Sequence, residues 1–408
     1  MDNTVAKISK LLPTKITDYL RDESIVDCAT LLLKATSAVG ANKSAQLKEG
    51  LQNIQAVLDF TWERLNIGHW MEVPVYQHQL YTLASLLKIV LLLQSHRGHS
   101  DVEVIREALH IADVGLIVGA PLELESGEGD LREVANILTL ALNEIYHPLE
   151  VREPPVVEDN EEILSFESTG LKCQEIPQVH CPSLERFHES YFKPHLPAKL
   201  TGCISHWPAL KLWTNMNYLV QRAGSRMVPV ELGAHYVDPA WCQDFMTLSE
   251  FIVKHITSQA DKVGYLAQHR LFDQVPELRA DIFEPEYCCL GESEQGTDIN
   301  AWFGPRGTVS PLHYDPKSNL LCQVVGSKRV LLFAPQESCY LYPHEQDPIT
   351  NTARVDPEQP DYSSFPEFKK AQGWECCLNP GEILFIPPRW WHYVRSLTTS
   401  FSVSFWWE

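Results

Sequence analysis

The fold of this chain is decided by the stretch GEILFIPPRWWH, residues Gly381–His392. Asn379-Pro380-Gly381 predicts a turn, and the apolar run Ile383–Ile386 predicts a short β-strand that ends at the Pro387-Pro388 pair. The aromatic residues that follow lead to His392, which we expect at the start of the next strand. The stretch therefore predicts a histidine presented by a β-sheet.

The sequence after His392 continues the β pattern. Ser400–Trp407, SFSVSFWW, largely alternates polar and apolar residues. Such alternation is typical of a strand with one face toward a barrel interior and the other packed outside. The C-terminal half is therefore predicted to be a β-barrel.

Two potential metal ligands precede this region in Ser310–Pro316, SPLHYDP. His313 and Asp315 stand at positions i and i+2, so on a strand both side chains point to the same face. With His392 they supply two imidazoles and one carboxylate, which suit one face of a non-haem Fe(II) and leave three positions open. An H-x-D triplet alone is weak evidence of a metal site in a chain with 16 histidines. The third ligand, His392, makes the evidence stronger. These three residues are the predicted catalytic metal ligands of an oxygenase.

Residues 165–408 resemble the jumonji-C 2-oxoglutarate oxygenases, whose fold is a cupin-like double-stranded β-helix, also called a jelly-roll barrel. The match is strongest to the small hydroxylase-like branch of that family. The resemblance implies Fe(II), with 2-oxoglutarate and O2 as co-substrates and succinate and CO2 as products. It is carried by Asn300–Gly304, Ser310–Pro316, Gly381–His392 and Phe401–Trp407.

The resemblance also implies a receptor for the distal carboxylate of 2-oxoglutarate. Lys328 follows the Gly326-Ser327 turn and opens the run Arg329–Phe333, so its ammonium can reach into the barrel as a counter-ion. The alternative is an exposed hairpin lysine, which the nearby ligand set disfavours. By the same resemblance, three residues add hydrogen bonds to this carboxylate: Tyr265, Ser310 and Asn319.

A substrate pocket is the least direct of these predictions. An arginine guanidinium in a partly dry cleft needs a carboxylate partner and a flat aromatic surface. Glu231, within Val228–Gly233, matches the family stretch that lines the substrate side, and Trp241 and Trp302 are the aromatic candidates. The alternative is that both tryptophans are core residues and that Glu231 is an exposed strand acid.

The sequence leaves several possible reactions open. Protein hydroxylation is favoured, because the first ligand pair is H-x-D where many lysine demethylases have H-x-E, and because no Cys/His-rich reader finger is present. The resemblance implies an arginine side chain as the target. Lysine demethylation uses the same first oxidation, after which a hydroxylated N-methyl group releases formaldehyde. A peptidase that clips histone tails, with the metal acting as a Lewis acid on water, is a further alternative. The last is a non-catalytic scaffold.

The formal net charge of −20 bears on the partners. It disfavours broad attraction to nucleic acid or anionic membranes and favours basic protein or peptide substrates, such as histone tails and ribosomal proteins. The alternative is that the acidity only keeps the protein soluble.

Residues 1–149 predict an all-helical domain, a bundle or short solenoid, so the class is α+β. This domain has no catalytic group of residues and is a candidate for binding another protein. Residues 150–164 contain prolines and mostly acidic charges, which predicts an exposed linker, with an acidic docking strip as the alternative. Apolar residues recur at helical spacing in Ile25–Leu33, Leu51–Leu65, Leu80–Leu93, Val102–Ile117 and Val134–Ile145.

Location follows from composition. No apolar run reaches the length of a membrane span, and no secretory signal is visible at the start of the sequence. The 11 cysteines include the adjacent pairs Cys288-Cys289 and Cys376-Cys377 and no C-x-x-C, a poor framework for disulfides or zinc. We expect reduced thiols and a protein of the nucleus, the cytoplasm or both.

Overall fold

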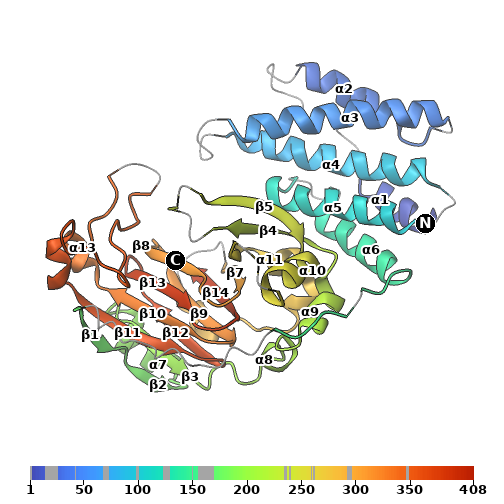
Figure 1. The fold of residues 1–408 in the computed structure, drawn as a ribbon. Helices are drawn as coiled ribbons and strands as arrows, with labels where there is room; N and C mark the ends of the chain where they lie inside the picture. Colours follow the sequence, from blue (N-terminus) through green and yellow to red (C-terminus); the bar gives the residue numbers. More distant parts are fainter. Residues whose placement is uncertain are drawn as a thin grey trace. The chain divides into compact units, whose positions relative to one another are not determined.

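The computed structural model describes residues 2–13, 26–41, 43–67, 73–97, 101–122, 129–148, 150–154, 170–233, 237–238, 240–258, 260, 262–291, 296–345 and 349–408. The chain forms two compact units, drawn in Figure 1. The first consists of Met1–Leu149 and Ser225–Met227. The second consists of Glu150–Gly224 and Val228–Glu408.

The first unit is built from helices that pack on one another in chain order, α2 on α3, α3 on α4, α4 on α5 and α5 on α6. The middle helix α4 is buried on most of its surface, because α3 and α5 lie on either side of it and α1 contacts it as well. None of the described helices is both long and apolar enough to cross a membrane. The helices are α1 (Asp2–Ser9), α2 (Val26–Ala38), α3 (Ser44–Leu65), α4 (Val75–Ser95), α5 (Val102–Val118) and α6 (Leu131–Asn143).

Two of these helices begin at an aspartate that caps the first turn. The Asp101 carboxylate accepts a hydrogen bond from the Glu103 amide, and the Asp130 carboxylate accepts one from the Arg132 amide, both at 2.9 Å. Each bond satisfies a backbone donor that the start of a helix leaves without a partner.

A buried ion pair ties Ser225–Met227 to the first unit. Arg226 donates to the Asp113 carboxylate of α5 through Nε at 3.0 Å and Nη2 at 2.7 Å. The Met227 amide donates to the same carboxylate at 2.8 Å. The two charged side chains are 1% and 0% exposed, so the pair is shielded from water.

The second unit contains two β-sheets. The smaller sheet has the strand order β1-β11-β10-β13-β8, and the larger has the order β2-β3-β12-β9-β14-β7-β6-β4-β5. The strands are β1 (Lys172–Glu175), β2 (Gln178–His180), β3 (Ala198–Thr201), β4 (Met227–Leu232), β5 (Cys242–Thr247), β6 (Gly264–His269), β7 (Asp298–Gly304), β8 (Val309–Tyr314), β9 (Ser318–Val325), β10 (Lys328–Phe333), β11 (Gln372–Leu378), β12 (Glu382–Ile386), β13 (Trp391–Ser396) and β14 (Ser400–Trp407).

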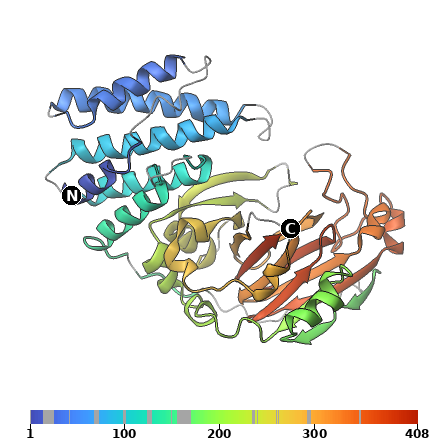
Figure 2. The same cartoon turned by 180° about the vertical axis from the view of Figure 1, so that it is seen from behind.

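Short helices lie in the connections of this unit. Phe187 of α7 packs into the cluster that includes Phe385 of β12, and Figure 2 shows α7 in green beside the strands. The helices are α7 (Leu184–Phe187), α8 (Ala209–Leu212), α9 (Met216–Ala223), α10 (Leu248–Phe251), α11 (Leu271–Gln274), α12 (Pro276–Arg279) and α13 (Ser338–Leu341). Single turns of other helical types are His188–Phe192, Ile252–Ile256, Glu286–Leu290, Pro335–Glu337 and Pro366–Lys370.

Strand β10 shows how the two sheets face each other. Val330 and Leu332 belong to a core cluster drawn from both sheets, whereas Leu331 and Phe333 belong to a different cluster. Because side chains alternate along a strand, Lys328 shares the inner face with Val330 and Leu332. The predicted α+β class, with helices followed by a cupin-like double-stranded β-helix, is confirmed.

The start of the predicted linker differs from the expectation. The Val151 amide donates to Asn217 Oδ1 at 2.7 Å, and Asn217 Nδ2 donates to the Val151 carbonyl at 3.0 Å. Val151 is half-buried against the core of the second unit. Its two backbone groups are held by one side chain, which a count of acids and prolines does not reveal. Residues 155–164 of the linker lie outside the described residues.

Candidate metal and co-substrate site

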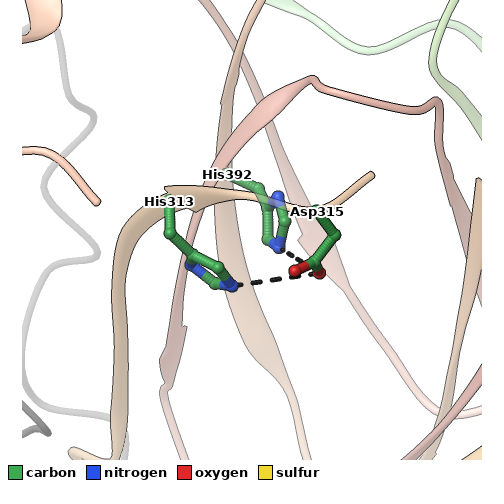
Figure 3. A group of neighbouring side chains, drawn as sticks. All are labelled: His313, Asp315 and His392. Carbon is green, nitrogen blue, oxygen red and sulfur yellow. Dashed lines mark ion pairs between the residues drawn. The ribbon is translucent and has the colours of Figure 1, made fainter. Parts of the chain in front are cut away.

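Three predicted ligands meet at the end of the smaller sheet. Strands β8 and β13 are antiparallel neighbours, and His313 stands opposite His392. Asp315 follows the last residue of β8, so it is not on the strand itself as the i, i+2 argument expected. Its Oδ2 nevertheless lies 3.5 Å from His392 Nε2 and 4.0 Å from His313 Nε2. Figure 3 shows the three side chains pointing toward one another. One donor atom from each residue lies within 4.8 Å of the others.

Backbone carbonyls fix the orientation of both imidazoles. His313 Nδ1 lies 2.7 Å from the Pro311 carbonyl, and His392 Nδ1 lies 3.0 Å from the Trp390 carbonyl. A carbonyl oxygen only accepts, so each Nδ1 carries the proton and each Nε2 presents a lone pair toward Asp315. This is the second hydrogen bond that metal-binding histidines generally make.

The charge states also fit a divalent metal. Burial, together with the neighbouring His392, lowers the pKa of His313 to about 4, so its imidazole is neutral near pH 7. Burial acts to raise the pKa of Asp315, but its contacts with His392 and His313 hold that pKa below its usual value. Two imidazoles and one carboxylate, converging on one point, form a donor set that suits Fe(II).

Lys328 is a buried cation in the same pocket. Its side chain is 1% exposed, and burial lowers its pKa to about 7. Nζ donates to the Tyr265 hydroxyl at 3.2 Å, and in the part of the chain that the structure describes no carboxylate lies within ion-pair distance of it. A buried ammonium without a counter-ion is costly. The pocket therefore suits an anionic ligand at this end.

Two further predicted residues line the same pocket as that ammonium. Ser310 is hydrogen-bonded to Tyr265, whose pKa burial raises. Asn319 Oδ1 is buried, and no described residue hydrogen-bonds to it. Tyr265, Ser310, Asn319 and Lys328 line the same pocket as the two histidines and the aspartate, which fits a ligand with a carboxylate at one end and metal-binding oxygens at the other.

Eight of the ten predicted site residues line one pocket of about 360 Å³, part of it open to solvent, and Glu231 and Trp241 are not among them. The sequence reasoning missed four residues of its wall. Alternation along β14 from Ser402 and Ser404 to Trp406 would have indicated Trp406, whereas the other three are indistinguishable from core residues in sequence. The lining consists of Tyr265, Trp302, Ser310, His313, Asp315, Asn319, Leu321, Lys328, Ile386, His392, Val394 and Trp406.

The predicted substrate residues lie in and beside this pocket. Trp302 lines it and donates from Nε1 to Ser404 Oγ at 2.9 Å. Glu231 of β4 pairs with Tyr265 of β6, one strand from the pocket wall. Trp241 Nε1 donates to Glu231 Oε2 at 3.2 Å, and burial raises the pKa of Glu231 despite that bond. The three side chains are half-buried, so neither a fully buried core role nor an exposed strand acid describes them.

Comparisons with known proteins agree with this geometry. Residues 184–408 match the family described as "Cupin-like domain". The chain is 40% identical over 414 residues to "Lysine-specific demethylase 8" of Danio rerio, which covers 98% of each chain. It is 40% identical over 396 residues to the protein of the same name in Xenopus tropicalis, covering 87% of this chain and 88% of that one.

A third relative carries the family in its name. The chain is 37% identical over 420 residues, covering 100% of both chains, to "Jumonji C domain-containing protein 5" of Drosophila melanogaster. Enzymes of this family use Fe(II), 2-oxoglutarate and O2, which is the chemistry for which the His313, Asp315 and His392 group is suited. The chain belongs to the cupin-like jumonji-C family of 2-oxoglutarate oxygenases, in the branch that includes Jumonji C domain-containing protein 5 and lysine-specific demethylase 8.

Proposed function

We propose that this chain is a protein arginyl hydroxylase that adds one oxygen atom to an arginine side chain of a basic protein and releases succinate and CO2. The observation that carries the proposal is the half-buried Glu231, held by Trp241 and one strand from the pocket that contains Lys328. A carboxylate in this position suits the guanidinium of arginine, whose planar fork of donors pairs with a carboxylate.

In this proposal His313, Asp315 and His392 hold Fe(II). When bound, the metal supplies the activation of O2 that oxidises an unactivated C–H bond. The two imidazoles and the carboxylate would supply three ligands to the metal and leave other positions for the co-substrate and O2. The carbonyls of Pro311 and Trp390 keep both imidazoles in the required tautomer.

Lys328, Tyr265, Ser310 and Asn319 would bind the distal carboxylate of 2-oxoglutarate. Protonated Lys328 neutralises that carboxylate, and the hydroxyl and amide groups add hydrogen bonds. The apolar side chains of Leu321, Ile386 and Val394 form part of the wall around the reacting centre.

The substrate side chain would enter between Trp302 and the Glu231 region. Glu231 accepts from the guanidinium, and the indoles of Trp241 and Trp302 provide flat surfaces for its planar face. The task of these residues is to hold one carbon of the substrate at a fixed place relative to the metal.

Lysine demethylation is the second candidate. It is supported by the name of the two vertebrate relatives, "Lysine-specific demethylase 8". Both reactions begin with the same oxidation, and only the fate of the oxidised carbon differs. The net charge of −20 suits either kind of basic substrate.

Mass spectrometry separates the possibilities. The protein would be incubated with Fe(II), 2-oxoglutarate and matched basic peptides containing arginine, lysine or N-methyl-lysine, with Asp315→Ala as the blank. A gain of one oxygen on the arginine peptide supports the proposal. Loss of a methyl group from the methyl-lysine peptide alone supports demethylation instead, and shortened peptides would point to cleavage.

A further inference from the structure

Strand β8, which ends at the ligand pair, is the outermost strand of its sheet. A short segment, Asn351–Ala353, covers its open edge. The Tyr314 amide donates to the Asn351 carbonyl at 3.0 Å, and the Ala353 amide donates to the Leu312 carbonyl at 2.8 Å. His313 is bridged to Thr352, between these two bonds. The segment thus adds a short antiparallel strand to the edge of the sheet beside His313.

Asn351 adds a contact that no sheet pairing supplies. Its side-chain Nδ2 donates to the Tyr314 carbonyl at 3.0 Å. Asn351 therefore binds both backbone polar groups of Tyr314, the residue between His313 and Asp315. The Tyr314 carbonyl belongs to the peptide unit that joins Tyr314 to Asp315, so this bond fixes the plane of that peptide.

The peptide unit after Asp315 is held from another direction. The Arg389 amide donates to the Asp315 carbonyl at 2.8 Å, and Arg389 adopts a left-handed φ of 63° just before the aromatic pair that leads to His392. Asp315 itself lies beyond the end of β8 and has no strand partner in the sheet. Its backbone is thus oriented by Asn351 on one side and by Arg389 on the other.

We propose that Asn351 is a positioning residue for the metal site: its amide fixes the 314–315 peptide and so aims the Asp315 carboxylate at the two Nε2 atoms. The inference rests on the proposed role of His313, Asp315 and His392 as metal ligands. A metal site requires its donors to be held within about 0.5 Å of the productive geometry, and groups that orient ligands change metal affinity by roughly 10- to 100-fold.

The test measures metal affinity directly, without turnover. Co(II) would be titrated into metal-free full-length protein and followed by its visible absorption. Asn351→Ala removes the amide, and Asn351→Asp keeps the size of the side chain but removes the N–H donor. Both variants should bind Co(II) about 10-fold or more weakly than the wild type. Thr350→Ala, at the exposed neighbouring residue, is the matched control and should bind normally.

The outcomes separate this inference from the function on which it rests. Wild-type affinity in Asn351→Asp overturns it, and loss in Asn351→Ala alone would mean that the side chain only fills space. Thermal unfolding by circular dichroism identifies a variant that fails to fold. If Asn351→Ala fails to fold, the Co(II) affinity of the isosteric Asn351→Asp variant decides whether the inference holds. If His392→Ala binds Co(II) as tightly as the wild type, the ligand assignment itself is wrong, whatever the Asn351 variants do.

Discussion

Lys328 is a positive charge in the interior of a β-sandwich, with a tyrosine hydroxyl as its hydrogen-bond partner. Burial lowers its pKa to about 7, so roughly half of the ligand-free protein carries a neutral Lys328 near that pH. An entering carboxylate favours the charged form. Binding of the carboxylate therefore promotes protonation of Lys328.

This predicts a pH dependence for co-substrate binding. Above the lowered pKa of Lys328, 2-oxoglutarate must draw a proton onto the amine, so its apparent Kd should rise about tenfold per pH unit between pH 8 and 9. Titration of the Mn(II)-loaded protein under nitrogen measures it. Lys328→Arg is the control, because arginine stays charged and should flatten the profile. A profile of equal slope in both proteins would exclude Lys328 as its source.

Asp315→Ala should abolish 2-oxoglutarate turnover while the fold persists. The change removes a donor from a pocket and takes no apolar side chain from the core. Loss of a coordinate bond typically cannot be replaced by a water at the same geometry. Succinate formation reports activity, and circular dichroism reports the fold. Succinate produced at the wild-type rate would remove Asp315 from the ligand set.

Glu231→Ala should separate the two half-reactions. Oxidation of an arginine peptide should fall at least tenfold, whereas slow 2-oxoglutarate decarboxylation without peptide should continue, because Glu231 lies outside the pocket lining. Glu231→Gln keeps the size and tests the charge alone. Equal loss of both activities would instead mean that Glu231, beside Tyr265, supports the co-substrate end.

At the scale of elements, strands were predictable where period-two alternation and turn residues coincide. The runs at Ile383–Ile386 and Ser400–Trp407 correspond to β12 and β14. The edge segment Asn351–Ala353 was not predictable, because its register depends on tertiary contacts with β8 and its sequence has no alternation. Helix α1 was missed for a related reason, since eight residues give too few turns for a helical period to emerge.

The cap of α6 gives a prediction at this scale. Asp130→Ala should destabilise the helical unit by about 1 kcal/mol, because the Arg132 amide loses its acceptor. Thermal unfolding followed by helical circular dichroism measures the change. Asp130→Asn is the matched control, since asparagine caps equally well, and a loss of the same size there would implicate the aspartate charge and not the hydrogen bond.

At the scale of the whole molecule, composition and periodicity were enough to predict helices followed by a β-barrel, and the jumonji-C resemblance added the double-stranded β-helix. They did not reveal that Ser225–Met227 belongs to the helical unit. The reason is that the buried pair of Arg226 and Asp113 joins positions far apart in sequence, and each looks like an ordinary surface charge when read alone. Likewise, Glu231 could be named from family resemblance and Trp241 as a nearby aromatic residue, but their mutual hydrogen bond required the fold.

Removal of Asp113 tests that buried pair. Asp113→Ala leaves the Arg226 guanidinium without its carboxylate in a dry site and should destabilise the helical unit by about 3–5 kcal/mol. Chemical denaturation followed by hydrogen exchange of α5 amides would locate the effect. The double variant Asp113→Leu, Arg226→Met should recover much of the loss, because replacing both charges leaves none unpaired. An equally unstable double variant would show that the shape of the pair matters more than its charge.

The strand order β10-β13-β8 places the Lys328 strand and both ligand strands side by side in the smaller sheet, whereas Glu231 and Trp302 stand on β4 and β7 of the larger one. In the proposed function, this division places the residues that recognise the substrate on a different sheet from the two histidine ligands and Lys328. Under the same proposal, mutations on β4, near the outer end of the larger sheet, can alter which side chain is recognised while the two histidine strands and the Lys328 strand stay unchanged. A lineage can therefore drift from one basic substrate to another without passing through an inactive ancestor.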